Sequence, residues 1–118
     1  MDRHQQIQRL YAAFNARDLD ALLGEMTEDV HWPNGWEGGW LDGQEAVRDY
    51  WTRQWAAIDP SVEPVETLEQ PDGTVAVRVH QVVREQDGTV IADHEVWHVW
   101  RFDGDAVAGM TIEESLPG

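Results

Sequence analysis

Three Asp-Gly pairs divide the second half of the chain at nearly equal intervals. They stand at Asp72-Gly73, Asp87-Gly88 and Asp103-Gly104. Asp-Gly between apolar runs is a strong hairpin signal, because both central residues of a type I′ turn need positive φ. The pattern predicts four long antiparallel strands, at about residues 62–70, 74–85, 89–102 and 105–115.

The first half of the chain has helical periodicity instead. Apolar residues recur three and four positions apart within residues 2–16, and Asp2 and Asp18 are placed to cap a first and a short second helix. Residues 44–58 predict a third helix, which Pro60 ends. Residues 30–32 suit a short strand, and the glycine-rich residues 36–43 suit a loop.

This order of elements predicts an α+β fold. We expect one domain over residues 1–118, in which three N-terminal helices pack on a strongly curved antiparallel sheet and close a cone.

Charge and composition exclude several partners. The net charge of -15 argues against nucleic acid and against an anionic membrane surface, since both need clustered basic residues. The chain has no Cys, so it forms no disulfide and no zinc–sulfur site. No apolar run is long enough to span a bilayer, and the first residues lack a signal-peptide pattern. We expect a soluble, cytoplasmic protein.

Tryptophan is unusually frequent. The chain has seven Trp against two Phe and two Tyr, which excludes an acidic disordered chain. Trp combines a large apolar ring with one N–H donor and so suits the wall of a ligand pocket. The alternative is that these rings only fill a small core.

The hairpin turns predict which residues share a face of the sheet. Pairing across Asp87-Gly88 places on the inner face Val75 with Trp100, Val77 with His98, Val79 with Val96, and Gln81 with His94. It places on the outer face Arg78 with Trp97, His80 with Glu95, and Val82 with Asp93. Pairing across Asp103-Gly104 places Gly109, Thr111 and Glu113 beside His98, Val96 and His94.

The outer face then mixes charged side chains with large apolar ones. Trp97, Val99, Met110 and Ile112 are its apolar members. Such a face suggests a homodimer through the sheet, with exposure to water as the alternative.

Five segments resemble the SnoaL-like branch of the NTF2-like superfamily. They are residues 11–22 (YAAFNARDLDAL), 28–32 (EDVHW), 41–51 (LDGQEAVRDYW), 98–104 (HVWRFDG) and 110–112 (MTI). The resemblance covers nearly the whole chain. It implies a curved sheet, a cone-shaped pocket closed by helices and commonly a homodimer. Ketosteroid isomerase, polyketide cyclases and limonene epoxide hydrolase belong to this superfamily.

The chain departs from the ketosteroid isomerase pattern at the catalytic positions. Asn34 aligns with the family's general base, and an amide accepts no proton at neutral pH. His98 aligns with the protonated aspartate of the oxyanion hole, and Trp51 with a pocket tyrosine. The helical tyrosine aligns with Leu10, one position before Tyr11. The Arg-x-Asp of the epoxide hydrolase has its nearest match in Arg78-Val-His80, on the outer face. Neither classical reaction is expected.

His98 and Asn34 remain as candidate catalytic residues. A neutral imidazole on an apolar face can take part in proton transfer near pH 7, and its alternative is a core histidine with one hydrogen bond. Asn34 can donate to a carbonyl or enolate oxygen, although Pro-Asn-Gly is also an ordinary turn sequence. His94 and Glu113 form either an acid–base pair or a polar rim.

The expected ligand is a small hydrophobic carbonyl compound. Its predicted contacts are Tyr11, Trp32, Trp51, Trp55, Val77, Val96, Trp100 and Thr111. We expect no metal, because His94 and His98 lie too far apart along a strand to share an ion, and no motif for a cofactor occurs. The predicted function is isomerase- or cyclase-type acid–base catalysis. The alternatives are a non-catalytic ligand-binding domain and a dimerisation domain.

Overall fold

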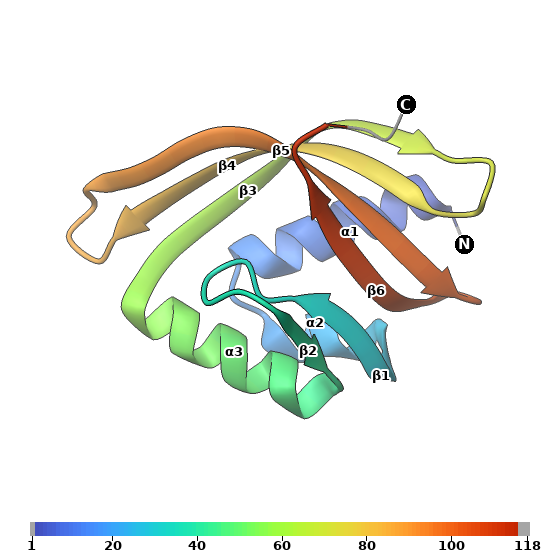
Figure 1. The fold of residues 1–118 in the computed structure, drawn as a ribbon, viewed down its shortest axis with the longest axis horizontal. Helices are drawn as coiled ribbons and strands as arrows, with labels where there is room; N and C mark the ends of the chain where they lie inside the picture. Colours follow the sequence, from blue (N-terminus) through green and yellow to red (C-terminus); the bar gives the residue numbers. More distant parts are fainter. Residues whose placement is uncertain (1, 116–118) are drawn as a thin grey trace.

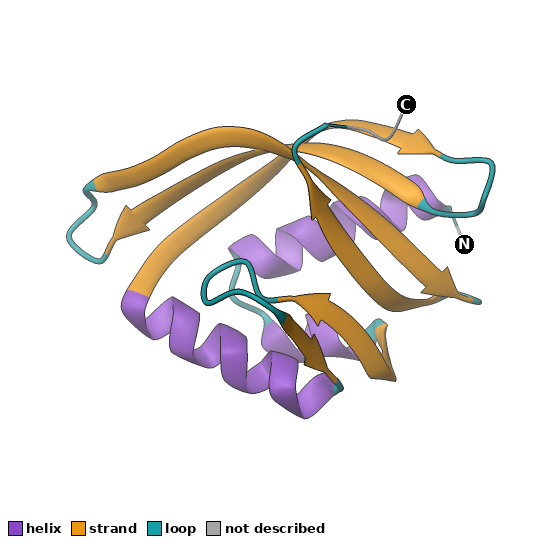
Figure 2. Ribbon diagram, in the orientation of Figure 1, coloured by secondary structure: helices purple, strands orange, loops and turns teal. Residues whose placement is uncertain are grey.

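The computed structural model describes residues 2–115. The expected single domain of residues 1–118 therefore includes four positions, 1 and 116–118, that lie outside the described residues. Helices α1, α2 and α3 lie on one side of a sheet (Figures 1 and 2). Within residues 2–115, no helix is both long enough and apolar enough to cross a membrane.

The three helices begin where the sequence predicts. Helix α1 (Arg3–Asn15) starts after Asp2, whose carboxylate accepts a hydrogen bond from the His4 N–H at 2.8 Å. Helix α2 (Leu19–Gly24) starts after Asp18, whose carboxylate accepts from the Ala21 N–H at 3.2 Å. Both side chains satisfy N–H groups that a helix start leaves without partners. Helix α3 spans Gln44–Ala57.

The sheet has six strands and is mixed, so the expectation of an antiparallel sheet is only partly right. The strands are β1 (Met26–Pro33), β2 (Trp40–Asp42), β3 (Ile58–Glu69), β4 (Val75–Glu85), β5 (Val90–Asp103) and β6 (Ala106–Glu113). Their order across the sheet is β2-β1-β6-β5-β4-β3. All neighbours are antiparallel except β1 and β6, which are parallel.

Two local predictions in the first half need correction. The glycine-rich segment 36–43 is not all loop, because Trp40–Asp42 forms strand β2 against β1. Pro60 does not end helix α3, which stops at Ala57, and lies inside β3 instead. Strand β3 is an edge strand with a neighbour on one side only, so Pro60, which has no N–H to donate, is tolerated there.

The predicted pairing of β4 with β5 is confirmed. Each predicted inner-face pair is present, including Val77 opposite His98 and Gln81 opposite His94. The outer-face pairs are also as predicted, including His80 opposite Glu95. The register shifts only beside the turn, between Val83 and Arg84, where a bulge leaves the rest of the ladder in place.

The predicted pairing of β5 with β6 is wrong by three residues. His98 lies opposite Ile112 rather than Gly109, and Thr111 lies opposite Val99 rather than Val96. The turn falls at residues 104–105, so Asp103 pairs with Ala106, and an irregularity at Arg101–Phe102 shifts the ladder again.

Because three is an odd number, this shift exchanges the two faces of β6. Met110 and Ile112 belong to the inner face with His98, not to the outer face. Glu113 lies opposite Trp97, so the predicted pair of His94 with Glu113 does not form.

Gly109 is where strand β1 approaches β6. A Cβ atom at this position would lie 2.8 Å from the His31 carbonyl oxygen, which is too close for any other residue without a shift of the backbone. His31 and Gly109 are partners in the parallel pairing of these strands. The glycine therefore lets the helical half of the chain join the sheet of the second half.

The core lies between the helices and the inner face of the sheet. Helix α1 contributes Ile7, Leu10 and Tyr11, and helix α3 contributes Val47, Tyr50 and Trp51. The sheet contributes mainly Val and Trp residues, all nearly inaccessible to solvent: Val30, Trp32, Val62, Val75, Val77, Val79, Trp100 and Val107.

Candidate functional site

A cavity of about 650 Å³ lies within this core. Eight of the ten predicted site residues line it: Tyr11, Trp32, Asn34, Trp51, Val96, His98, Trp100 and Thr111. Residues that were not predicted to belong to the site also line it, among them Tyr50, Gln54, Met110 and Ile112. Met110 and Ile112 were missed because the predicted register placed them on the other face.

Val77 and Trp55 do not line the cavity. Val77 is completely buried in the sheet opposite His98. Trp55 stacks on Trp51 with ring centroids 5.8 Å apart and packs edge-on against Phe14. Trp55 therefore supports the wall from behind, and one further helical turn from Trp51 carries it past the cavity.

His98, Tyr11 and Trp100 form a hydrogen-bonded chain at the closed end of the cavity. The Trp100 Nε1–H donates to the Tyr11 hydroxyl oxygen at 3.0 Å, and that hydroxyl lies 2.7 Å from His98 Nδ1. The Tyr11 and His98 rings are nearly parallel, at an interplanar angle of 11°. Both residues are buried, with His98 only 7% exposed. Strands β4 and β5 place His98, while helix α1 places Tyr11.

Burial moves the pKa of both titratable groups. It lowers the pKa of His98 to about 4, because the imidazolium ion is poorly solvated there. It strongly raises the pKa of Tyr11, against a smaller lowering by the Trp100 hydrogen bond. At neutral pH the pair is therefore an uncharged imidazole and an uncharged phenol.

Trp residues form the wall beside this chain. Trp32 meets Trp51 and Trp100 edge to face, with centroid distances of 5.3 and 5.4 Å. Tyr11 meets Trp100 in the same way at 5.6 Å. Edge-to-face packing of this kind holds each ring in one orientation. These rings form a buried aromatic cluster to which β1, α3 and β5 contribute the Trp residues.

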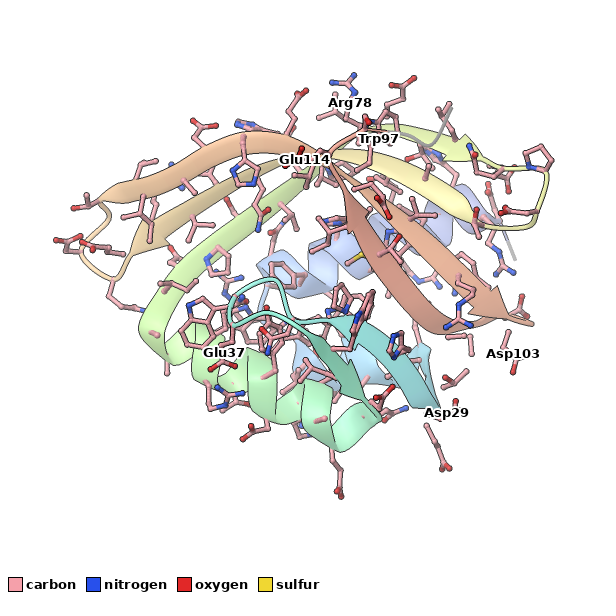
Figure 3. All side chains as sticks on the ribbon, in the orientation of Figure 1. Asp29, Glu37, Arg78, Trp97, Asp103 and Glu114 are labelled. Carbon is pink, nitrogen blue, oxygen red and sulfur yellow. The ribbon has the colours of Figure 1, made fainter. Side chains whose placement is uncertain are left out.

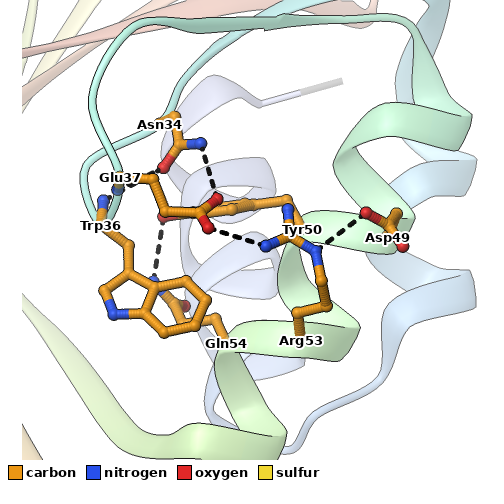
Figure 4. Close-up of polar contacts among 7 residues, drawn as sticks. All are labelled: Asn34, Trp36, Glu37, Asp49, Tyr50, Arg53 and Gln54. Carbon is orange, nitrogen blue, oxygen red and sulfur yellow. Dashed lines mark hydrogen bonds and ion pairs between the residues drawn. The ribbon is translucent and has the colours of Figure 1, made fainter.

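Asn34 organises the loop that follows β1 (Figure 4). Its side-chain oxygen accepts from the backbone N–H of Trp36 and of Glu37, at 3.3 and 2.7 Å. Its amide nitrogen donates to Glu37 at 3.2 Å. The oxygen and one amide N–H are therefore used within the loop, which is the turn-forming role considered for this residue. Asn34 also lines the cavity.

Ion pairs hold this loop to helix α3. Arg53 donates to both Glu37 and Asp49 at 2.9 Å, and its hydrogen bond holds the pKa of Glu37 below the usual value (Figure 4). Close by, Gln54 donates to the Tyr50 hydroxyl at 2.9 Å. Burial raises the pKa of Tyr50. Tyr50 and Gln54 thus form a second polar group in the cavity. Their spacing in the sequence places both on helix α3 but does not indicate the hydrogen bond between them.

The cavity opens along strand β5. On the inner face, Trp100 and His98 are buried, Val96 is partly buried and His94 is exposed. Ile91 and Ile112, which line the cavity, are 52% and 43% exposed. His98 therefore lies at the deep end and His94 at the open end.

Residues 2–115 contain no group of three His, Asp or Glu side chains placed to hold a metal ion. His31 is paired instead with Asp42 at 2.6 Å and stacked on Trp40, and His80 is paired with Asp93 at 2.6 Å. Each of these histidines has one carboxylate partner on the surface.

The model of the SnoaL-like domain family matches residues 7–110 of the chain. Among solved structures, TerC co-crystallised with polyporic acid is 25% identical, with a TM-score of 0.79, over 94% of this chain and 89% of that one. An NTF2-like protein of unknown function from Burkholderia pseudomallei is 24% identical, with a TM-score of 0.81, over 98% and 92%.

A third similar structure also contains a small molecule. It is RV0760c from Mycobacterium tuberculosis in complex with estradiol-17beta-hemisuccinate, 19% identical with a TM-score of 0.79, over 92% of this chain and 90% of that one. A search of curated proteins gave no match.

Proposed function

The chain belongs to the SnoaL-like domain family, and we propose that its cavity binds a small, largely apolar carbonyl compound. His98 is the contact for the carbonyl oxygen. One observation carries this proposal: His98 is a buried polar side chain at the deep end of a Trp-lined cavity, and only its Nδ1 has a hydrogen-bond partner among the described residues.

The size and walls of the cavity support such a ligand. A volume of about 650 Å³ is in the usual range for sites that enclose a small organic molecule. Trp32, Trp51 and Trp100 offer flat apolar surfaces, and we propose that the sheet curves around them as the wall of a cone. Among the similar proteins, TerC was co-crystallised with polyporic acid and RV0760c is in complex with estradiol-17beta-hemisuccinate, which supports a small organic ligand.

We propose chemistry of the isomerase or cyclase type, in which His98 acts on the oxygen of the reacting carbonyl. The chain contains no Lys and no Cys, so its own side chains offer neither an amine for a Schiff base nor a thiolate nucleophile. Asn34 retains one amide N–H outside its loop hydrogen bonds and is proposed as a second donor to the ligand. The alternative is a domain that holds the same ligand without turnover.

The outer face of the sheet is proposed to bind a second copy of the chain. Trp97 and Val99 remain apolar members of this face, but Met110 and Ile112 do not. Figure 3 shows Trp97 and Arg78 on the side of the sheet away from the helices. We further propose one domain over the whole chain and a cytoplasmic location, on the strength of its acidic, Cys-free composition.

The test is a titration of the intrinsic Trp fluorescence with a panel of steroid, terpene and aromatic polyketide ketones. His98→Leu is expected to weaken binding of those ketones that bind the wild-type protein by about tenfold, the value of one buried hydrogen bond. His94→Leu is the matched control, because His94 is an exposed histidine on the same strand and face.

Equal affinities for both variants and the wild-type protein would exclude His98 as the carbonyl contact. Failure of the whole panel to bind would overturn the proposed ligand class. Proton NMR of each bound ketone after incubation, which distinguishes isomers of equal mass, then decides between turnover and simple binding.

A further inference from the structure

The direction of one hydrogen bond in the chain from Trp100 to His98 is fixed by chemistry. An indole N–H donates and never accepts. The Tyr11 hydroxyl oxygen, 3.0 Å from Trp100 Nε1, must therefore accept from it. The hydroxyl has one proton of its own, which needs an acceptor because Tyr11 is only 4% exposed.

The acceptor for that proton is His98 Nδ1. It lies 2.7 Å from the hydroxyl oxygen, and no other described residue makes a hydrogen bond with this oxygen. If Nδ1 carried the proton instead, the imidazole and the indole would both donate to the hydroxyl, and the phenolic proton would be left without a partner in a buried site. An unmade buried hydrogen bond of this kind disfavours the arrangement by about tenfold or more.

We propose that Tyr11 is a positioning residue that holds His98 in the tautomer with its proton on Nε2. At the deep end of the cavity, His98 Nε2 then presents an N–H donor rather than a lone pair. His98 stabilises negative charge on a ligand oxygen by donating a hydrogen bond, and it does not remove a proton from the ligand. This narrows the acid–base role proposed for His98 and rests on that proposed function for its ligand.

The electrostatics of the pair agree with a donor that keeps its proton. Burial lowers the pKa of His98 to about 4, so the ring is neutral and its Nδ1 lone pair is free to accept from Tyr11. Burial raises the pKa of Tyr11, so the phenol does not readily transfer its proton to His98 Nδ1. Without that transfer, His98 keeps the proton on its Nε2. A neutral histidine that polarises an oxygen without releasing its own proton is an established catalytic role.

The surroundings of His98 supply no base to replace it. The described residues that line the cavity include one carboxylate, Glu113, and one further histidine, His94, which lies at the open end, and no Lys or Arg. Glu113 lies opposite Trp97, whose neighbour His98 faces the other side of the sheet. A reaction in this cavity therefore starts from a ligand that is already an enolate or phenolate, or takes its base from water or from His94 at the open end.

A donor at the deep end of the cavity also selects the polar group of the ligand. A ketone or enolate oxygen only accepts, so it pairs with the Nε2–H and leaves nothing unsatisfied. The corresponding alcohol also accepts, but its own hydroxyl proton then faces the aromatic wall of Trp32 and Trp100. We expect the wild-type protein to bind camphor about tenfold more tightly than borneol, its alcohol.

The decisive measurement is made on the protein without ligand. Nitrogen NMR of ¹⁵N-histidine-labelled protein distinguishes the two tautomers by the chemical shifts of Nδ1 and Nε2. The Nε2–H form is expected for His98 at pH 7. The Nδ1–H form, or an even mixture, in the wild-type protein would overturn the proposal whether or not any ligand binds.

Two variants separate positioning from general structure. Tyr11→Phe removes the acceptor of the Trp100 N–H and the donor to Nδ1, and it is expected to give a mixture of tautomers and to reduce the camphor-to-borneol preference at least threefold. Tyr50→Phe removes another buried hydroxyl, which is hydrogen-bonded to Gln54 and not to His98, and is expected to leave the His98 tautomer unchanged. An unchanged tautomer in Tyr11→Phe would refute the role of Tyr11.

If that variant does not fold, the wild-type spectrum alone decides. Failure of every ketone to bind, with the Nε2–H tautomer present, would refute only the proposed ligand.

Discussion

His98 and His80 are two histidines on adjacent strands that face opposite sides of the sheet. His98 is buried beside Tyr11, and burial lowers its pKa to about 4. His80 is exposed and hydrogen-bonded to Asp93 at 2.6 Å, and this bond, together with Glu95 and Glu63 nearby, raises its pKa. Two residues of one type thus respond to pH in opposite ways.

The two faces of the sheet thus provide opposite environments for an ionisable side chain. The inner face removes water and keeps its histidine neutral, which suits an apolar ligand. The outer face keeps its charges in water, where Arg78 bridges Glu66 and Glu95 across three strands. Ion pairs of this exposed kind add little stability, so the inner face should dominate folding.

The largest expected effect comes from removing a ring of the inner face. Trp51→Ala should lower the free energy of unfolding by about 3–5 kcal/mol, because the ring is 3% exposed and packs against Phe14, Trp32 and Trp55. Urea unfolding measures the change. Trp97→Ala on the outer face is the control and should cost clearly less. An equal loss from both variants would contradict the contrast between the faces.

A smaller effect is expected from pH. Unfolded His98 takes up a proton near its ordinary pKa of 6.5, whereas folded His98 does so near 4. Between these values the unfolded state binds more protons, so stability is complete above pH 6.5 and falls as the pH drops toward 4. The loss attributable to His98 is about 3 kcal/mol.

Urea unfolding at several pH values between 4 and 7, compared with His98→Leu, isolates this contribution. The variant should show a flatter dependence of stability on pH in that interval. His80→Asn is the control on the outer face. Since the pKa of folded His80 is raised, its contribution has the opposite sign, and its removal should not flatten the curve. Parallel curves for wild type and His98→Leu would show that His98 is not held neutral by burial.

The smallest effect on stability is expected at Trp97. Trp97→Glu places a charge on the proposed dimer face without touching the cavity, so ligand binding and the unfolding midpoint of the separated chain should change little. Sedimentation velocity should show a dimer for the wild-type chain and a monomer for the variant. A monomeric wild-type protein would exclude the proposed interface.

Sequence reasoning succeeded where local signals are strong. Asp2 and Asp18 predicted both helix starts because capping depends only on neighbouring residues. The Asp87-Gly88 turn predicted the partner of His98 in β4, since side chains alternate strictly along a strand. The resemblance to the SnoaL-like family identified the fold over most of the chain.

Sequence reasoning failed where a contact from outside the hairpin decides the geometry. At Asp103-Gly104 the turn is displaced by one residue and the ladder shifts at Arg101, so Thr111, Met110 and Ile112 changed faces. Strand β2 is three residues long and follows the loop of residues 34–39 that Asn34 organises, so it is too short to detect by periodicity. The bond between Tyr11 and His98 joins residues 87 positions apart.

The amino-acid sequence alone predicts the three helices, the four long strands of the second half and the acidic, Trp-rich composition, because capping, turn and alternation preferences act over a few residues. Only the tertiary structure decided that Trp100, Tyr11 and His98 share one hydrogen-bonded chain, and that Val77 and Trp55 stand behind the wall rather than in it. The physical reason is that burial and hydrogen-bond direction depend on every neighbour at once. Those neighbours come from strands and helices far apart in the chain.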